Sequence, residues 1–395
     1  MSRNRWMVLG LLLAMSLTWA FPWGGLGQDQ PVIRLGGTLS ETGRLAATAA
    51  LYIDGRNLAL DVINAGGGVV IGGVSYQLEM VLLDDQSDAD LAVRLYTQLA
   101  EEDQVDFFLG PYSSGIVLPT SVIAEQFKIP MVEGGGASTN IFDRGFKYVF
   151  GTLPAGTNYL QNAIKLFKEQ AGAQTMGLVY ADDAFSTNVA EGARLWAAEY
   201  GLQIVADEKY ADGQTEFSSL IAKLKDQNPD VVMGANHLAE MLAFVPQARS
   251  LGLLSDLVFT VGTENQDFLA LGDVAEGVFG VTPWLTDQDT SGDTFGSASD
   301  YTEMFEGRFG FTPEYHNANG SVEILIYKKA IEAAGSLDRE AVRNAIAGIS
   351  FDSFYGPVSF SEDGQIGTGQ SVIQIQNGVS VGVLGGTDPI FNSRR

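Results

Sequence analysis

Short apolar runs alternate with longer segments of helical periodicity along most of this 395-residue chain. The runs that predict buried strands lie at 31–39, 76–83, 105–109, 129–132, 148–150, 175–180, 202–205, 230–233, 257–261 and 278–281. The helical segments lie at 46–64, 89–102, 116–127, 158–170, 187–200, 217–226, 238–251, 298–309, 321–334 and 339–347. Such alternation predicts an α/β fold with parallel sheets and crossover helices.

The alternation occurs in two series, which indicates two lobes with a cleft between them. The first series ends near Gly151-Thr152-Leu153-Pro154, where we expect the chain to leave its first lobe. A segment at 286–299, rich in Asp, Ser, Thr and Gly, predicts a long surface loop. Two or three closing strands are expected between Phe351 and Leu384.

Two neighbouring strand ends carry small polar residues and glycines. Ser113, Ser114 and Gly115 precede a helix, and the run Gly134-Gly-Gly-Ala-Ser-Thr139 follows the next strand. Hydroxyl groups and free N–H groups at a helix N-terminus favour a small anion such as a carboxylate, and open α/β sheets bind ligands at the carboxyl ends of their strands. Alternatively, Ser114 only caps the helix and the glycines only turn the chain.

The composition is that of a globular protein with an acidic surface. Hydrophobic residues make up 46% of the chain and charged residues 18%, and the formal net charge is −25. Such a surface argues against nucleic acid or an anionic membrane as a partner. The length suffices for two domains, each with its own core.

The N-terminus resembles a secretory leader. Arg3 and Arg5 precede a mostly apolar stretch from Trp6 to Ala20, and cleavage is expected after Ala20 or Gly27, although an uncleaved anchor is an alternative. The chain contains no cysteine, which excludes disulfides, thiolate chemistry and the acylated cysteine of a bacterial lipoprotein. We therefore expect a protein that is free in the periplasm.

Several stretches, in order, are similar to the leucine/isoleucine/valine-binding protein family, the solute receptors of branched-chain amino-acid ABC transporters. They are Arg34-Leu-Gly-Gly-Thr-Leu-Ser-Glu-Thr-Gly, Asp61-Val-Ile-Asn-Ala-Gly-Gly-Gly, Leu83-Asp-Asp-Gln-Ser, Leu109-Gly-Pro-Tyr-Ser-Ser, Arg144-Gly-Phe-Lys-Tyr-Val-Phe, Phe217-Ser-Ser-Leu-Ile-Ala-Lys-Leu-Lys and Ala275-Glu-Gly-Val. The similarity covers about residues 31–384.

The resemblance implies a type I periplasmic binding fold, with two Rossmann-like lobes joined by three crossover strands. After a signal peptide at 1–27, one lobe would comprise 31–152 and 285–360 and the other 153–284 and 361–395. A monomer of this kind closes on a small ligand, expected here to be an amino acid, and delivers it to a membrane ABC permease. The alternative is a sensor for amides, urea or aromatic and carboxylic acids that signals to a membrane receptor.

The resemblance also implies where the ligand carboxylate binds. Ser114, next to Ser113, matches the family serine for the α-carboxylate, and the turn from Gly135 through Gly136 and Ala137 to Ser138 matches the segment that supplies backbone groups and a hydroxyl. The sequence departs from the family at Ala137, where threonine is frequent. Either Ser138 or Thr139 supplies the hydroxyl, or it is absent.

The second lobe is implied to contribute three side chains. Phe185 matches an aromatic that closes over the ligand, His237 matches another cleft aromatic, and Glu264 matches the acid that binds the ammonium group. Each has a simpler interpretation: Phe185 as core, His237 as a structural or surface residue, and Glu264 as a solvated turn acid.

The sequence predicts no enzyme and no cofactor. It has no G-x-S-x-G, H-E-x-x-H or P-loop motif, and its only histidines, His237 and His316, are too far apart in sequence to suggest a metal site. A hydrolase that pairs Ser114 with His237 across a closed cleft is the remaining enzymatic alternative.

Overall fold

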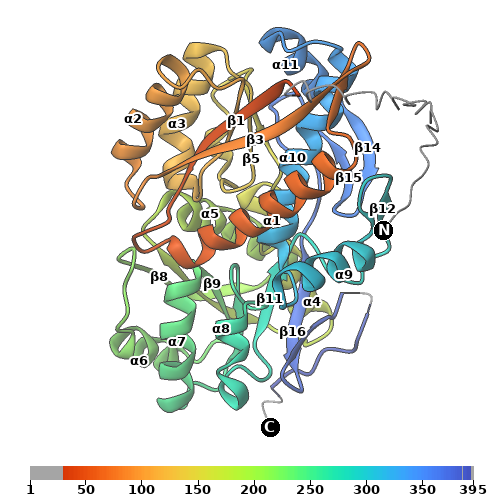
Figure 1. The fold of residues 1–395 in the computed structure, drawn as a ribbon. Helices are drawn as coiled ribbons and strands as arrows, with labels where there is room; N and C mark the ends of the chain where they lie inside the picture. The colour runs from red at the N-terminus through yellow and green to blue at the C-terminus, as the bar shows by residue number, and fades with distance from the viewer. Residues whose placement is uncertain (1–29, 385, 393–395) are drawn as a thin grey trace, which may run out of the picture.

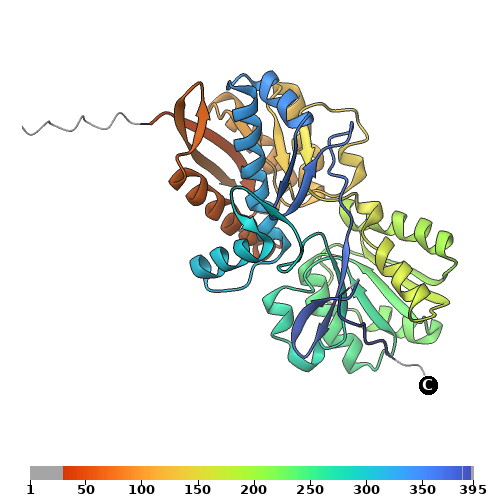
Figure 2. The same cartoon turned by 90° about the vertical axis from the view of Figure 1, so that its right-hand side faces the viewer.

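Residues 30–384 and 386–392 are described by a computed structural model, and the predicted leader at 1–27 lies outside them. The chain forms two α/β lobes, each built on one mostly parallel sheet flanked by helices, which confirms the predicted fold class (Figure 1). Figure 2 shows the two lobes side by side, with chain segments running between them. Within the described ranges, no helix combines the length and the apolar character needed to cross a membrane.

The first lobe contains a six-stranded sheet of order β2-β3-β1-β4-β5-β6. Its elements are β1 (Val32–Leu39), α1 (Ala46–Ala65), β2 (Val69–Ile71), β3 (Val74–Asp84), α2 (Ala89–Glu101), β4 (Phe107–Leu109), α3 (Ser114–Phe127), β5 (Met131–Glu133), the 3-10 turn η1 (Thr139–Ile141) and β6 (Val149–Gly151). Only the β2–β3 hairpin is antiparallel in this sheet. Because β1, β4 and β5 are parallel, their carboxyl ends lie at one edge.

The second lobe contains a seven-stranded sheet of order β17-β16-β11-β10-β9-β7-β8. Its elements are η2 (Gly156–Asn158), α4 (Gln161–Glu169), β7 (Thr175–Ala181), α5 (Ala184–Tyr200), β8 (Gln203–Tyr210), α6 (Ser218–Gln227), β9 (Val231–Ala235), α7 (Leu238–Ser250), β10 (Asp256–Phe259), α8 (Gln266–Leu269), η3 (Gly272–Val274), β11 (Phe279–Thr282), β16 (Ser371–Gln376) and β17 (Val379–Gly382). The strands β16 and β17 are antiparallel to their neighbours.

Between β11 and β16 the chain returns to the first lobe. This return contains β12 (Ser291–Gly292), β13 (Gly296–Ser297), α9 (Ala298–Phe309), α10 (Tyr315–Ala334), α11 (Arg339–Ala347), β14 (Ser350–Ser353) and β15 (Gly356–Ser359), and α10 packs along α1. The chain thus passes between the sheets three times. The first and third passages are joined by backbone hydrogen bonds from Gly151 N to Gly364 O and from Ile366 N to Gly151 O. The exact lobe boundaries at 152, 284 and 360 stay a prediction.

Three local predictions were wrong. The segment 286–299 is not only a loop, because β12 and β13 form a hairpin in it, and four strands follow α11 where two or three were expected. The helix α10 begins at Tyr315 and not at 321. Its first turn looks like a loop in the sequence, but Glu314 and Asn317 form a reciprocal capping box that satisfies the helix N-terminus.

A buried ion pair lies beneath the strand ends of the first lobe. Arg56 of α1 donates from Nε to Glu323 of α10 at 2.7 Å and from Nη2 to the carbonyl of Gly110 at 2.7 Å. Both side chains are 1% exposed or less. Nearby, the buried Glu133 accepts from Gly136 N–H, and burial raises its pKa well above the ordinary value. The Arg56 guanidinium therefore supplies positive charge to a region that contains two buried carboxyl groups, those of Glu323 and Glu133.

Replacing Arg56 with methionine tests this arrangement. The loss of the cation leaves the Glu323 carboxylate buried without its partner, so the free energy of unfolding should fall by about 3–5 kcal/mol. Urea denaturation measures it. Arg308→Met is the matched control, because the ion pair of Arg308 with Asp61 is more than half exposed and its loss should cost less than about 1 kcal/mol. Equal losses in the two variants would contradict the assignment.

Candidate functional site

Ser114 joins the two strand ends that the sequence singled out. Its Oγ accepts hydrogen bonds from the N–H groups of Ala137 at 3.0 Å and Ser138 at 3.2 Å, and the side chain is fully buried. Ser113, also buried, precedes the first residue of α3 and makes no side-chain capping bond. The structure therefore brings Ser114 and the turn after β5 together at the N-terminus of α3.

The glycines of this turn allow a close approach of backbone to neighbouring groups. A Cβ on Gly135 would lie 2.0 Å from the carbonyl oxygen of Pro111, and one on Gly134 would lie 1.7 Å from the side chain of Asn319. Gly136 donates its N–H to Glu133 at 2.7 Å. Larger residues would therefore push the turn away from the end of β4.

The hydroxyl groups after the turn differ in their partners. Ser138 Oγ is buried and has no hydrogen-bond partner among the described residues. Thr139 forms two hydrogen bonds with Asn188 of α5. The Thr139 N–H donates to Asn188 Oδ1 at 3.1 Å, and Asn188 Nδ2 donates to the Thr139 hydroxyl at 3.0 Å. Of the two residues that could replace the missing threonine hydroxyl, Ser138 is therefore the one whose hydroxyl is unpaired among the described residues.

A small cavity lies between the lobes beside this turn. Its walls are formed by Tyr112, Gly135, Ala137, Leu153, Tyr159, Phe185, His237, Val261 and Tyr315. The volume open to the centre of a water molecule is about 10 Å³, room for about one water. The predicted site residues Gly135, Ala137, Phe185 and His237 are therefore brought together, and aromatic side chains fill most of the space among them.

Several polar contacts join the two lobes, and three of them are made by His237, Asn188 and Asp212 of the second lobe. Tyr112 Oη lies 2.9 Å from His237 Nδ1. Thr139 binds Asn188 as described, and Arg44 pairs with Asp212 at 2.7 Å. Each contact joins the first lobe to the second, so the lobes meet directly across the site.

His237 is held between Tyr112 and an acid of its own lobe. Its Nε2 lies 3.6 Å from Asp183 Oδ1, the carboxylate that caps α5 by accepting from Phe185 N–H and Ser186 N–H. Burial, the largest single influence, disfavours the charged imidazole, but the adjacent Asp183 carboxylate and the charge of Glu240 together outweigh it and raise the pKa of His237. Burial likewise opposes the charge of Asp183, but the charge of His237 and the Ser186 hydrogen bonds lower the pKa of Asp183 to about 2.

These contacts also bear on the enzymatic alternative. The two ring nitrogens of His237 face Tyr112 and Asp183, while the hydroxyl of Ser114 lies against backbone N–H groups. The structure does not form the Ser114–His237 hydrogen bond that a hydrolase would need. Within the described residues, no three His, Asp or Glu side chains are grouped to hold a metal ion.

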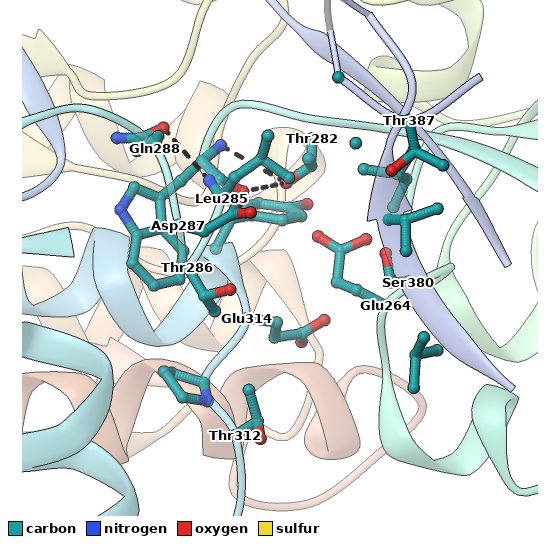
Figure 3. A pocket seen from close by; sticks show the side chains of 18 of the residues that line it. Glu264, Thr282, Leu285, Thr286, Asp287, Gln288, Thr312, Glu314, Ser380 and Thr387 are labelled. Carbon is teal, nitrogen blue, oxygen red and sulfur yellow. Dashed lines mark hydrogen bonds between the residues drawn. The ribbon is translucent and has the colours of Figure 1, made fainter. Parts of the chain in front are cut away.

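Glu264 lines a second, larger pocket of about 660 Å³ that shares Tyr315 with the small cavity. Figure 3 shows its carboxylate facing the pocket near that of Glu314. Neither carboxylate oxygen of Glu264 has a hydrogen-bond partner among the described residues, although both are shielded from solvent. Burial, followed by the negative charge of Glu314, raises the pKa of Glu264 to about 8.

Sequence reasoning missed most of the residues that border these two spaces, among them Tyr112, Tyr159, Glu314 and Tyr315. Tyr112 stands within the motif around Ser114, so a signal for it was present. Glu314 and Tyr315 lie at the start of α10, which periodicity placed six residues too late. No local signal indicated Tyr159.

Two α/β lobes that meet across a buried polar site, with unpaired groups facing the space between them, define a bilobal ligand-binding protein. A model of the periplasmic binding protein family matches residues 32–379. The chain belongs to this family.

Individual relatives agree with this assignment. The leucine-, isoleucine-, valine-, threonine- and alanine-binding protein of Pseudomonas aeruginosa is 26% identical over 359 residues, which cover 90% of this chain and 92% of that protein. A leucine-binding protein of Thermotoga maritima superimposes with a TM-score of 0.81 at 21% identity, covering 89% of this chain and 97% of that one. A solute-binding protein of R. palustris in complex with benzoate gives 0.80 at 21% identity, covering 92% and 100%. The predicted family is confirmed, whereas the predicted site residues stay a prediction.

The His237–Asp183 pair predicts a defined pH dependence of stability. Because the pKa of His237 is raised, its contribution is complete below the ordinary value of about 6.5 and is lost as the pH rises through the raised value. Because the pKa of Asp183 is lowered, its contribution is complete above about 4 and is lost as the pH falls toward 2. The pair should therefore stabilise the fold most between about pH 4 and 6.5.

Asp183→Asn removes the charge but keeps an N-cap side chain. At pH 6 this variant should be less stable than the unmodified protein by on the order of 2 kcal/mol, and the difference should shrink as the pH approaches 9. Urea denaturation at pH 6, 7.5 and 9 measures the trend. Asp182→Asn, at an exposed neighbouring carboxylate, is the control. A difference that does not vary with pH would contradict the assigned pair.

Proposed function

We propose that this protein is an extracytoplasmic solute-binding component of an ABC transporter that captures an α-amino acid between its lobes and delivers it to a membrane permease. Membership of the periplasmic binding protein family supports a solute-binding role. The Pseudomonas relative is named as a binding protein for five neutral amino acids, which supports an amino-acid ligand.

The unpaired carboxylate of Glu264 carries the proposal of an amine-bearing ligand. A buried carboxylate without a hydrogen bond is costly, and among the described residues no cation is paired with that of Glu264. An ammonium group of a ligand would supply both the positive charge and the missing donors. The raised pKa of Glu264 fits a site that lacks its cation, because a nearby positive charge would lower the pKa.

The carboxylate end of the ligand is proposed to bind at the turn after β5. Ser114 and the unpaired hydroxyl of Ser138 lie there, at the N-terminus of α3, where the helix dipole favours negative charge. The N–H groups of Ala137 and Ser138 now bind Ser114 Oγ. On binding, the ligand carboxylate would share these donors with the serine.

The aromatic walls of the small cavity favour a second candidate, an aromatic acid. Tyr112, Tyr159, Phe185, His237 and Tyr315 surround that space, and a solute-binding protein with the same fold holds benzoate. An aromatic acid would use the Ser114 end alone. It would leave Glu264 buried and unpaired, which is why the amino acid is preferred.

A ligand screen separates the two candidates. We expect amino acids to raise the melting temperature and benzoate to have little effect, with Glu264→Gln removing most of the amino-acid effect. Thermal-shift measurements with neutral and charged amino acids, benzoate, amides and urea provide the comparison. Tight binding of an acid without an amine would replace the amino-acid proposal with the aromatic-acid one.

Ser114→Ala tests the carboxylate end. The substitution removes a hydroxyl that would bond a charged group, so affinity for the ligand should fall by about 1.5–3 kcal/mol in calorimetry. Ser250→Ala, at the exposed end of α7 and outside both pockets, should leave affinity unchanged. An unaltered affinity in Ser114→Ala would place the ligand carboxylate elsewhere.

Delivery to a permease is tested in cells. Deleting the gene should abolish high-affinity uptake of the radiolabelled ligand, whereas a sensor would leave uptake intact and alter only the response to the ligand. Complementation with the unmodified protein should restore uptake, and complementation with Glu264→Gln should not.

A further inference from the structure

The larger pocket contains more carboxylates than one ammonium group can pair. It lies between the end of the second lobe's sheet, the passage that follows β11, and the start of α10. Four carboxylates, Glu264, Asp287, Asp289 and Glu314, line it, and none of its lining residues is Lys, Arg or His. With the net charge of the whole chain at −25, the pocket attracts cations.

Two of these carboxylates are buried and close enough to interact. Glu314 is 6% exposed. Its Oε1 lies 2.9 Å from His316 Nδ1, whereas Oε2 has no hydrogen-bond partner among the described residues. Glu264 has none at either oxygen. The two side chains reach the same pocket from different elements, Glu264 from the loop after β10 and Glu314 from the segment before α10 (Figure 3).

A single ammonium group does not pair both buried carboxylates, those of Glu264 and Glu314. If the α-ammonium group of the ligand binds Glu264, the free oxygen of Glu314 remains a buried acceptor without a donor. Like charges held close together also repel each other strongly when they are shielded from water. A second donor that carries positive charge would relieve both defects.

We propose that the ligand is a basic amino acid, whose cationic side chain, ammonium or guanidinium, binds Glu314 in this pocket while its α-ammonium group binds Glu264. This inference rests on the proposed function and narrows its ligand class. The pocket volume of about 660 Å³ lies within the 300–1,000 Å³ that is typical of small-molecule sites. The exposed carboxylates Asp287 and Asp289 at the rim add to the field that draws in such a ligand.

The competing explanation is that Glu264 and Glu314 share a proton and need no second cation. The two explanations differ in how the site ranks ligands of equal shape. A site that requires charge prefers arginine to citrulline, in which a neutral urea group replaces the guanidinium, and prefers lysine to norleucine, which lacks the terminal ammonium.

Titration calorimetry on the unmodified mature protein makes this comparison without any substitution. We expect arginine or lysine to bind at least about ten-fold more tightly than its neutral partner, the loss expected when a hydrogen bond between charged groups is removed. Equal or tighter binding of the neutral partner in both pairs overturns the inference but leaves the amino-acid proposal standing. Absence of binding by every α-amino acid overturns both.

The variant Glu314→Gln tests whether the preference for a charged ligand depends on the Glu314 carboxylate. Glutamine keeps an oxygen acceptor for the capping box of α10 but removes the charge. Affinity for the preferred basic amino acid should fall about ten-fold or more, while affinity for its neutral partner should change less than about three-fold. Glu303→Gln, at an exposed position of α9 outside the pocket, should alter neither. Equal losses for the charged and neutral ligands in Glu314→Gln would overturn the assigned role of Glu314.

Discussion

The guanidinium of Arg56 is the constraint on which the geometry of the site depends. It links α1 to α10 through Glu323, a residue 267 positions later in the chain, and it links both helices to the end of β4 through the carbonyl of Gly110. Tyr52, one turn earlier on α1, donates to the carbonyl of Gly134 in the adjacent turn. Because these partners are buried, a displacement of any one would leave charge or polar groups unpaired. The strand ends that position Ser114 are therefore fixed by two helices from the two separate chain segments of the first lobe, α1 and α10.

The polar groups near the buried Arg56–Glu323 ion pair and the two cavities form two sets. One set is paired within the protein and determines shape, as in the bonds of Ser114 to the turn and of Thr139 to Asn188. The other set, Ser138, Glu264 and the free oxygen of Glu314, is buried without hydrogen-bond partners in the part of the chain that the structure describes. A site discriminates most strongly through buried groups that only the correct ligand can pair. In the proposed site, ligand choice would therefore depend on a few unpaired atoms, while the aromatic walls would limit the size of the ligand.

The sequence predicted the fold well because apolar runs and helical periodicity are local signals. It also placed Ser114 and the glycine turn at neighbouring strand ends, since parallel strands end at one edge. It could not show that aromatic side chains from both lobes nearly fill the space between them, because that packing depends on how the lobes meet. Glu314 was missed for a related reason. Its partner Asn317 and its neighbour Glu264 become informative only when α10 is docked against the second lobe.

The second passage between the lobes has two structural attachments. Thr282, at the end of β11, donates its hydroxyl to the carbonyl of Trp284, and the indole N–H of Trp284 reaches Phe354 near β14 in the first lobe. The residues from Trp284 to Asp289 also form one wall of the large pocket. The same few residues thus serve as a connector between the two lobes and as part of the wall of the pocket. A substitution in that wall would change the lining of the pocket and the attachment between the lobes together, so the evolution of the pocket and of the connection is tied to one short segment.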